Sequence, residues 1–182
     1  MSEDHTIPTI KGIFLNSHIA ALRKEKGDEA VAELKKRMGK KLEYGNSTDV
    51  PVSEEVRLIE HALTILRNDQ ISESDKAFEA GKLHFKNFVT TPLARIIFPV
   101  FRNQFKLLML NANNIAGHVF NHVGFESQEL GEKSVKITML NNDYPIDHFQ
   151  GLFQAWMEYS DLTGTVTAEK MDHRYEYTIK WE

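Results

Sequence analysis

The stretch KSVKITML, residues 133–140, indicates which class of fold this chain adopts. Every second residue from Val135 to Met139 is apolar, which is the period-two pattern of a strand that buries one face. Residues 125–130 predict a partner strand, because the Gly131-Glu132 pair between the two segments favours a tight turn. The sequence therefore predicts a pair of antiparallel strands here.

A helix and a second hairpin follow this pair. The segment DYPIDHFQGLFQAWMEYS, residues 143–160, predicts an amphipathic helix with a broad apolar stripe made of Ile146, Phe149, Phe153, Trp156 and Met157. Residues 164–170 and 173–181 then predict two strands joined around Met171-Asp172. Residues 125–182 should thus form a four-stranded antiparallel sheet with one inserted helix, in the order strand-strand-helix-strand-strand.

The first two thirds of the chain are mainly helical in pattern. Helical spacing predicts helices over residues 28–38, from Ser53 onward, and over residues 72–88. A longer helical pattern runs from Ile97 to Val123, in which Pro99 forces a kink or a restart of the helix, and residues 101–123 form its main part. We therefore expect an α+β fold and a single domain over residues 1–182, in which a helical layer (residues 1–124) packs on the sheet.

Composition excludes several classes of function. The chain has 182 residues, is 41% hydrophobic and 26% charged, and carries a formal net charge of -4. That charge gives no basic surface for nucleic acid. The absence of cysteine excludes disulfides and thiolate chemistry, and no apolar run reaches the roughly 20 residues of a membrane span. We expect a cytoplasmic protein without a nucleic-acid partner.

Several short motifs, taken in order, resemble a known family. They are Ile10-Lys11-Gly12-Ile13-Phe14, Gly81 followed by Phe88 and Thr91, Asn113-Asn114, Tyr144-Pro145 with Gly151, and the terminal Trp181. Together they resemble a paralogous family of myxobacteria and related predatory bacteria. That family in turn is similar to the superfamily of heme–nitric oxide binding domains, four-vinyl-reductase domains and TRAPP subunits. The resemblance implies N-terminal helices, a C-terminal four-stranded sheet, and in many members a lipophilic molecule between the layers.

Aromatic residues on separate helical segments form the candidate ligand site. The proposed wall comprises Gly81, Phe85, Phe88, Phe101, Phe105, Phe153 and Trp156. Aromatic rings can converge between a helical layer and a sheet, and a glycine can leave room beside them. The competing interpretation is that the rings pack one another, and that Gly81 lets a neighbouring helix approach closely.

Metal and heme chemistry have weaker support. His118 and His122 are four residues apart and would share one face of a helix, the spacing of His-Glu-x-x-His zinc proteases, but the glutamate of that motif is missing. The same two histidines are the candidates for a heme ligand. The Tyr-x-Ser-x-Arg run with which heme-binding relatives hold the propionates is absent. We expect no metal and no cofactor, with heme as the alternative.

No motif indicates catalysis. The chain lacks a Gly-x-Ser-x-Gly elbow, a phosphate-binding glycine loop and a dinucleotide fingerprint. Asp143, Asp147 and His148 could converge for acid–base work, but capping and solvent exposure explain them more simply. We therefore expect a protein that is not an enzyme.

Two classes of function remain. The first is a sensory or signalling module that binds a small lipophilic ligand, a protein partner, or both. The second is a ligand-free scaffold or adaptor that acts through homodimerisation, in the manner of TRAPP subunits. A heme-based gas sensor is a third alternative. In each case a homodimer is expected, with the helical segment Phe101–Val123 as the first candidate interface.

Overall fold

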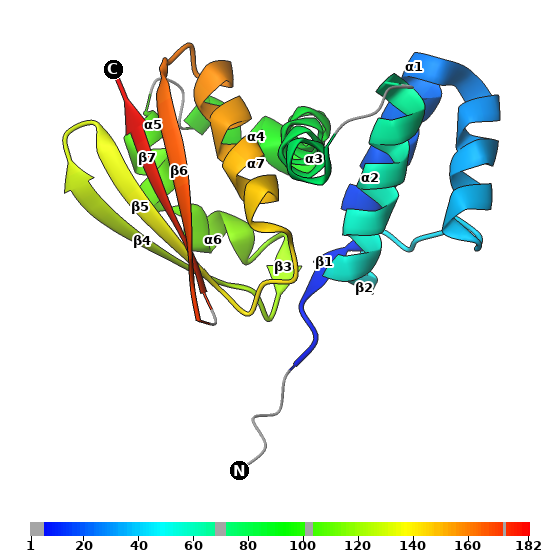
Figure 1. Cartoon of the computed structure of the whole chain (residues 1–182), viewed down its shortest axis with the longest axis horizontal. Coiled ribbons are helices and arrows are strands. Elements are labelled where there is room, and N and C mark those ends of the chain that lie inside the picture. The colour runs from blue at the N-terminus through cyan, green and yellow to red at the C-terminus, as the bar shows by residue number, and fades with distance from the viewer. Residues whose placement is uncertain (1–5, 68–71, 101–103, 173) are drawn as a thin grey trace.

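The C-terminal part of the chain forms the sheet that its alternating pattern predicts. A computed structural model of the chain describes residues 6–67, 72–100, 104–172 and 174–182 (Figure 1). Its larger sheet consists of β4 (Gly124–Gly131), β5 (Ser134–Leu140), β6 (Gly164–Met171) and β7 (Arg174–Trp181). The strand order is β4-β5-β7-β6 and all three pairings are antiparallel. The predicted α+β fold with a four-stranded antiparallel sheet and one inserted helix is confirmed.

A second, smaller sheet does not follow from the sequence pattern. It joins β1 (Thr9–Lys11), β2 (Asp49–Pro51) and β3 (Phe120–Asn121) in the order β2-β1-β3. These strands have only two or three residues, which is too short for an alternating pattern to be recognised. The small sheet ties the segment before α1 to the segment that leads into β4.

The helices form layers beside the large sheet. They are α1 (Gly12–Met38), α2 (Val52–Arg67), α3 (Glu73–Phe88), α4 (Pro92–Val100), α5 (Phe105–Leu110), α6 (Ala112–Ala116) and α7 (Ile146–Tyr159). In Figure 1, α7 lies along the sheet, α3 follows it, and α1 and α2 lie on the far side of α3. The helix α1 is interrupted at Gly27, whose φ of 82° and ψ of -176° are not helical. No helix of the described chain is long and apolar enough to cross a membrane.

The helices α3 and α7 approach each other through two glycines. A Cβ atom on Gly81 would overlap the carbonyl group of His148, and one on Gly151 would overlap the carbonyl group of Phe78. Each glycine therefore lets the backbone of one helix press against the other. The structure places Gly81 at a helix–helix contact and not beside open space.

Two helix predictions differ from the structure. The predicted helix over residues 101–123 is wrong in its length, because α5 and α6 are separate short helices and β3 follows them. Asn111 separates them with φ -97° and ψ 14°, and its side-chain amide donates to the carbonyl oxygen of Leu107. Asparagine favours such local hydrogen bonds over helix continuation. The helix predicted over residues 28–38 is the second part of α1, which already begins at Gly12.

One hydrophobic core connects the helices with the sheet. Fully buried side chains from α1, α2 and α7 belong to the same packed cluster as those of the sheet, for example Leu15, Leu58, Met157, Ile137 and Tyr177. The Tyr177 hydroxyl donates to the carbonyl oxygen of Ile146 at 3.0 Å, which anchors the start of α7 on the sheet. The described chain therefore folds around a core that spans the helical part and the sheet.

Candidate functional site

Polar residues occupy core positions on four helices. His18 on α1, Glu55 on α2, His84 on α3 and His148 on α7 expose 1%, 0%, 3% and 1% of their surface. Each lies on the buried face of its helix among apolar neighbours. Charged and polar side chains are rarely this buried unless they are paired or functional. These residues therefore form the first candidate site.

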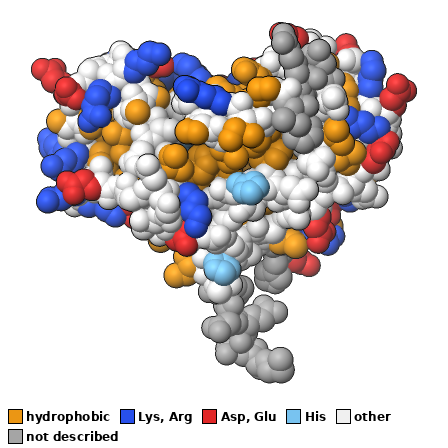
Figure 2. Space-filling model, turned by 180° about the vertical axis from the view of Figure 1, so that it is seen from behind, with side chains coloured by type: hydrophobic (Ala, Val, Ile, Leu, Met, Phe, Trp, Pro, Cys, Tyr) orange, Lys and Arg blue, Asp and Glu red, His pale blue; other side chains and the backbone are white. Residues whose placement is uncertain are grey.

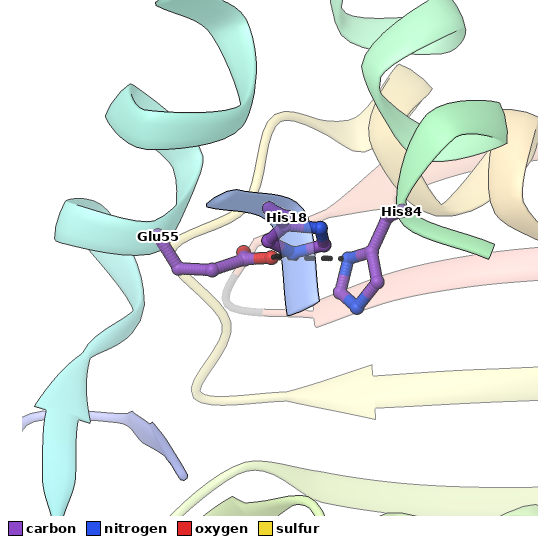
Figure 3. Close-up of side chains that lie close together, drawn as sticks. All are labelled: His18, Glu55 and His84. Carbon is purple, nitrogen blue, oxygen red and sulfur yellow. Dashed lines mark hydrogen bonds and ion pairs between the residues drawn. The ribbon is translucent and has the colours of Figure 1, made fainter. Parts of the chain in front are cut away.

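The four side chains converge on one another (Figure 3 shows three of them). Glu55 Oε1 accepts a hydrogen bond from His18 Nε2 at 2.7 Å and lies 3.4 Å from His84 Nδ1. His84 Nδ1 also lies 3.0 Å from His148 Nε2. On the other side, Asn87 Nδ2 is 2.9 Å from His18 Nδ1. The cluster thus links α1, α2, α3 and α7 through their side chains.

The electrostatics favour one ionised carboxylate beside neutral imidazoles on His84 and His148. Burial alone would raise the pKa of Glu55, but its histidine neighbours reverse the shift and lower that pKa to about 2. Burial lowers the pKa of His84 to about 4 and that of His148 to about 3. The causes differ: burial disfavours a charge on either imidazole, whereas the neighbouring His84 and the hydrogen bond from His18 favour the charged form of Glu55.

Two oxygen atoms in the cluster are unsatisfied. Glu55 Oε2 and the Tyr144 hydroxyl oxygen are buried and complete no hydrogen bond of acceptable geometry in the described structure. Tyr144 exposes 1% of its surface, and its ring centroid lies 4.6 Å from that of His148. Burial and the nearby Glu55 raise the pKa of Tyr144 well above its usual value, so its hydroxyl stays protonated. The Tyr144 hydroxyl and the Glu55 carboxylate are therefore close enough to interact, although no hydrogen bond between them has good geometry in the described structure.

An apolar cavity adjoins the cluster. It has a volume of about 60 Å³, is partly open, and is lined by α3, α6, α7 and the segment from Val119 to Phe125. Its lining is His84, Phe85, Phe88, Ala112, Ile115, Ala116, Val119, Phe120, Phe125, Phe149, Leu152, Phe153 and Trp156. His84 is the one ionisable side chain among these described lining residues, and it belongs to both the cluster and the cavity wall. The two sites therefore share a residue.

The rings of the wall largely pack against one another. The Phe85 and Trp156 centroids are 5.4 Å apart, and those of Phe88 and Trp156 are 6.2 Å apart. Such separations are typical of favourable aromatic pairs. The Trp156 Nε1 is buried without a hydrogen-bond partner among the described residues. An otherwise apolar wall therefore contains one unsatisfied hydrogen-bond donor.

The structure brings four of the seven predicted ligand residues together. Phe85, Phe88, Phe153 and Trp156 line the cavity. Gly81 does not line it, because the backbone of α7 closes the space above that residue. Phe105 is also separate from it, and its ring packs at 5.1 Å on Trp181 at the end of β7. Phe101 lies outside the described residues.

The predicted heme candidates are not in the cavity wall. His118 follows α6 in a turn and His122 follows β3, so the two do not share a helix face. Both are exposed, and His122 has a φ of 62°. The prediction that they lie on one helix is wrong because α6 ends at Ala116.

Three members of the buried cluster, His18, Glu55 and His84, are not among the residues that the sequence pattern singles out. Glu55 fits the favourable first turn of a helix, yet it shares the inner face with Leu58, Ile59 and Ala62. His148 does not join Asp143 and Asp147 at the surface and lies instead in the buried cluster. A charged residue in the apolar series of an amphipathic helix is the signal that could have identified the site.

Comparison with solved structures defines the class of fold. A point mutant of the H-NOX protein from T. Tengcongensis matches at 16% identity and a TM-score of 0.65, covering 94% of this chain and 97% of that chain. A mutant H-NOX protein from K. algicida, in its Fe(II) unliganded form, matches at 15% identity and a TM-score of 0.67, covering 94% and 96% of the two chains. The oxygen complex of an oxygen-binding H-NOX domain related to soluble guanylate cyclases matches at 15% identity and a TM-score of 0.66, covering 94% and 95%.

These likenesses show that the chain has the fold of H-NOX domains. A family of proteins of unknown function, DUF2378, matches residues 6–182, and the chain belongs to this family. A search of curated protein sequences finds no significant match.

The described cavity does not fit a heme group. Its volume of about 60 Å³ is well below the roughly 300–1,000 Å³ of small-molecule pockets. The lining residues include no arginine, lysine, serine or tyrosine that could hold a propionate. His84, the one histidine in the wall, already directs Nδ1 toward Glu55 and His148. The described lining of this cavity therefore does not fit a heme group in the present arrangement of the helices.

Proposed function

We propose that this protein is a sensory module that binds a small apolar molecule between its helical part and its sheet, without turning it over. The observation that carries the proposal is the aromatic cavity shared by α3, α6 and α7. Ligand sites are commonly concave and apolar, with a few polar groups that fix orientation. Here the available polar groups are Trp156 Nε1 and the His84 ring.

The size of the cavity restricts the ligand. An engineered cavity of roughly 150 Å³ admits benzene or xenon, so a cavity of about 60 Å³ suits a ligand of few heavy atoms unless its wall moves. A long acyl chain would require α6 or α7 to shift. The preferred ligand is therefore small and apolar, with at most one hydrogen-bond acceptor to receive the Trp156 N–H.

The H-NOX fold supports the sensory part of the proposal. One of the comparison structures is an oxygen complex of an H-NOX domain, so a small molecule is held by this fold in another protein. In the present chain, a ligand beside His84 would contact the residue that joins α3 to α1, α2 and α7. Binding would thus bias the packing of four helices at once.

A tryptophan fluorescence titration tests this function. The chain has two tryptophans, and in a Trp181→Phe background only Trp156, in the cavity wall, remains as the reporter. Titration with short aliphatic ketones such as acetone, which have few heavy atoms and a single hydrogen-bond acceptor, should give a saturable change in its emission. Ala116→Leu fills the cavity wall and should abolish that change, whereas Ala32→Leu on the exposed face of α1 should preserve it.

The proposal fails if the emission of Trp156 changes without saturation, or if Ala116→Leu binds the probes as the parent does. Sensing also requires the bound ligand to alter the protein surface. A change in amide hydrogen exchange along α3 and α7 on binding would report this.

An adaptor acting through homodimerisation is the second candidate. Figure 2 shows hydrophobic side chains gathered in a band across the upper middle of one face. In addition, a groove of about 570 Å³ lies between α2, α3 and α7 and has Leu63, Leu66, Leu83 and Val89 in its wall. The wall of this groove also contains the charged residues Glu25, Arg67, Glu79, Lys82, Lys86 and Glu158, so the groove is partly apolar and partly charged. The apolar band of Figure 2 is therefore the feature that favours protein docking. Sedimentation of a monomer alone at tens of micromolar would count against a stable homodimer.

A further inference from the structure

Three buried residues on three helices present ligand atoms to a common point. His18 Nε2, a carboxylate oxygen of Glu55 and His84 Nδ1 all lie within 4.8 Å of one another. Figure 3 shows the two imidazole rings directed toward the Glu55 carboxylate from α1 and α3. Two imidazoles and one carboxylate are a donor set typical of divalent transition-metal sites.

The spacing of the donors suits such an ion. Ligand atoms on a tetrahedral ion with bonds of about 2.0–2.1 Å are roughly 3.3 Å apart. The Glu55 Oε1 to His84 Nδ1 distance is 3.4 Å, and the Glu55 Oε1 to His18 Nε2 distance is 2.7 Å. Small rotations of the His18 and Glu55 side chains would therefore separate their ligand atoms enough to admit an ion, without movement of a helix.

Two groups compete for a proton on His84 Nδ1. Its Nδ1 lies near both Glu55 Oε1 and His148 Nε2, at 3.4 Å and 3.0 Å. A proton on Nδ1 can be directed well at only one of them, and without that proton Nδ1 presents a lone pair to the carboxylate. A metal cation at this point would accept one lone pair from the His84 ring and one from the Glu55 carboxylate.

Charge leads to the same conclusion. The described ion pairs of Glu55 are with His18 and His84, and no lysine or arginine contributes one. A fully buried carboxylate without a cation is costly, and Glu55 Oε2 completes no hydrogen bond in the described structure. A bound divalent cation would compensate the charge of the Glu55 carboxylate.

The surroundings resemble the outer shell of a metal site. A histidine that binds a metal through one ring nitrogen usually donates a hydrogen bond from the other. Asn87 lies 2.9 Å from His18 Nδ1, and turning its amide over would present Oδ1 as the acceptor. The fourth residue of the cluster, His148, and the neighbouring Tyr144 are not members of this ligand set, and His148 Nε2 lies 3.0 Å from His84 Nδ1.

We propose that His18, Glu55 and His84 bind one divalent transition-metal ion, of which Zn²⁺ is the representative, beside the apolar cavity. This inference goes beyond the proposed ligand function and does not depend on it. Because His84 belongs to both sites, the ion would lie one imidazole ring away from the cavity. The metal would tie together α1, α2 and α3 from within the core.

Metal content and Co²⁺ spectroscopy test the site. The full chain, expressed with added zinc and freed of loosely bound ions by gel filtration, should contain about one zinc per chain. Glu55→Gln and His84→Gln should lose it and should bind Co²⁺ at least about 100-fold more weakly, since even outer-shell changes cost roughly 10–100-fold. His118→Gln, an exposed histidine outside the cluster, should retain both properties.

Circular dichroism establishes that each variant is folded. If Glu55→Gln does not fold, the test relies on His84→Gln instead, because that variant removes an uncharged ligand. Co²⁺ titration of the chelator-treated wild type is independent of any variant and should give a saturable visible band at one equivalent. The proposal is overturned if wild type binds no stoichiometric Co²⁺, or if zinc content falls in His118→Gln and not in His84→Gln. Failure of short aliphatic ketones to bind would leave these results unchanged and would bear only on the ligand proposal.

Discussion

At the scale of single residues, the most informative positions are those that depart from the amphipathic pattern of their helix. Glu55 occupies the inner face of α2 and is fully buried. The amphipathic pattern predicts α2 correctly, but it does not reveal that an acidic residue in the first turn faces inward. Its burial is stabilised by His18 and His84, which lie on other helices. A single sequence does not show which residues of different helices will be in contact.

Gly81 gives a prediction at the same scale. Alanine normally favours a helix over glycine by about 0.5–1 kcal/mol, yet here the added Cβ would overlap the His148 carbonyl group. We expect Gly81→Ala to lower the free energy of unfolding by about 1–3 kcal/mol, as overpacking does. Chemical denaturation provides the measurement.

Gly131→Ala is the matched control for this variant. A methyl group added at Gly131 would meet no atom within 4 Å, and this glycine has no positive φ. The change in the free energy of unfolding should stay within about 0.5 kcal/mol. Equal stability of Gly81→Ala and wild type would mean that α3 and α7 are not in backbone contact.

At the scale of elements, regular periodicity decides what can be predicted. The four strands of the large sheet and the inserted α7 follow from the sequence because each contains several repeats of its pattern. The strands β1 to β3 contain too few residues for a pattern, and they form through pairing between distant segments. The break between α5 and α6 depends on Asn111, whose local hydrogen bond outweighs the apolar spacing on either side.

The arrangement of α3, α6 and α7 also bears on heme. These helices leave a cavity of about 60 Å³, and the exposed His118 and His122 lie outside its lining. We therefore expect protein expressed with added hemin to be colourless after purification. A Soret band that disappears in His84→Ala, His118→Ala or His122→Ala would show that the helices separate to admit heme, and it would favour a gas sensor.

At the scale of the whole molecule, the helical part and the sheet share one core, and the candidate sites lie inside it. Four of the predicted aromatic residues line the cavity because they lie on α3 and α7, the elements that the sequence predicts well. Phe105 belongs to the segment whose helix is predicted too long, and it packs on the end of the sheet instead. The position of a residue is therefore predicted correctly from the sequence only where its helix or strand is also predicted correctly.

Crystals exposed to xenon test most directly whether the aromatic cavity admits a small apolar molecule. Dry apolar cavities bind xenon, whose position is read from its electron density. We predict one xenon atom among Phe85, Phe153 and Trp156 in the wild type, and none there in Ala116→Leu. Wild-type crystals with no xenon in this cavity, or equal occupancy in Ala116→Leu, would contradict the proposed ligand site.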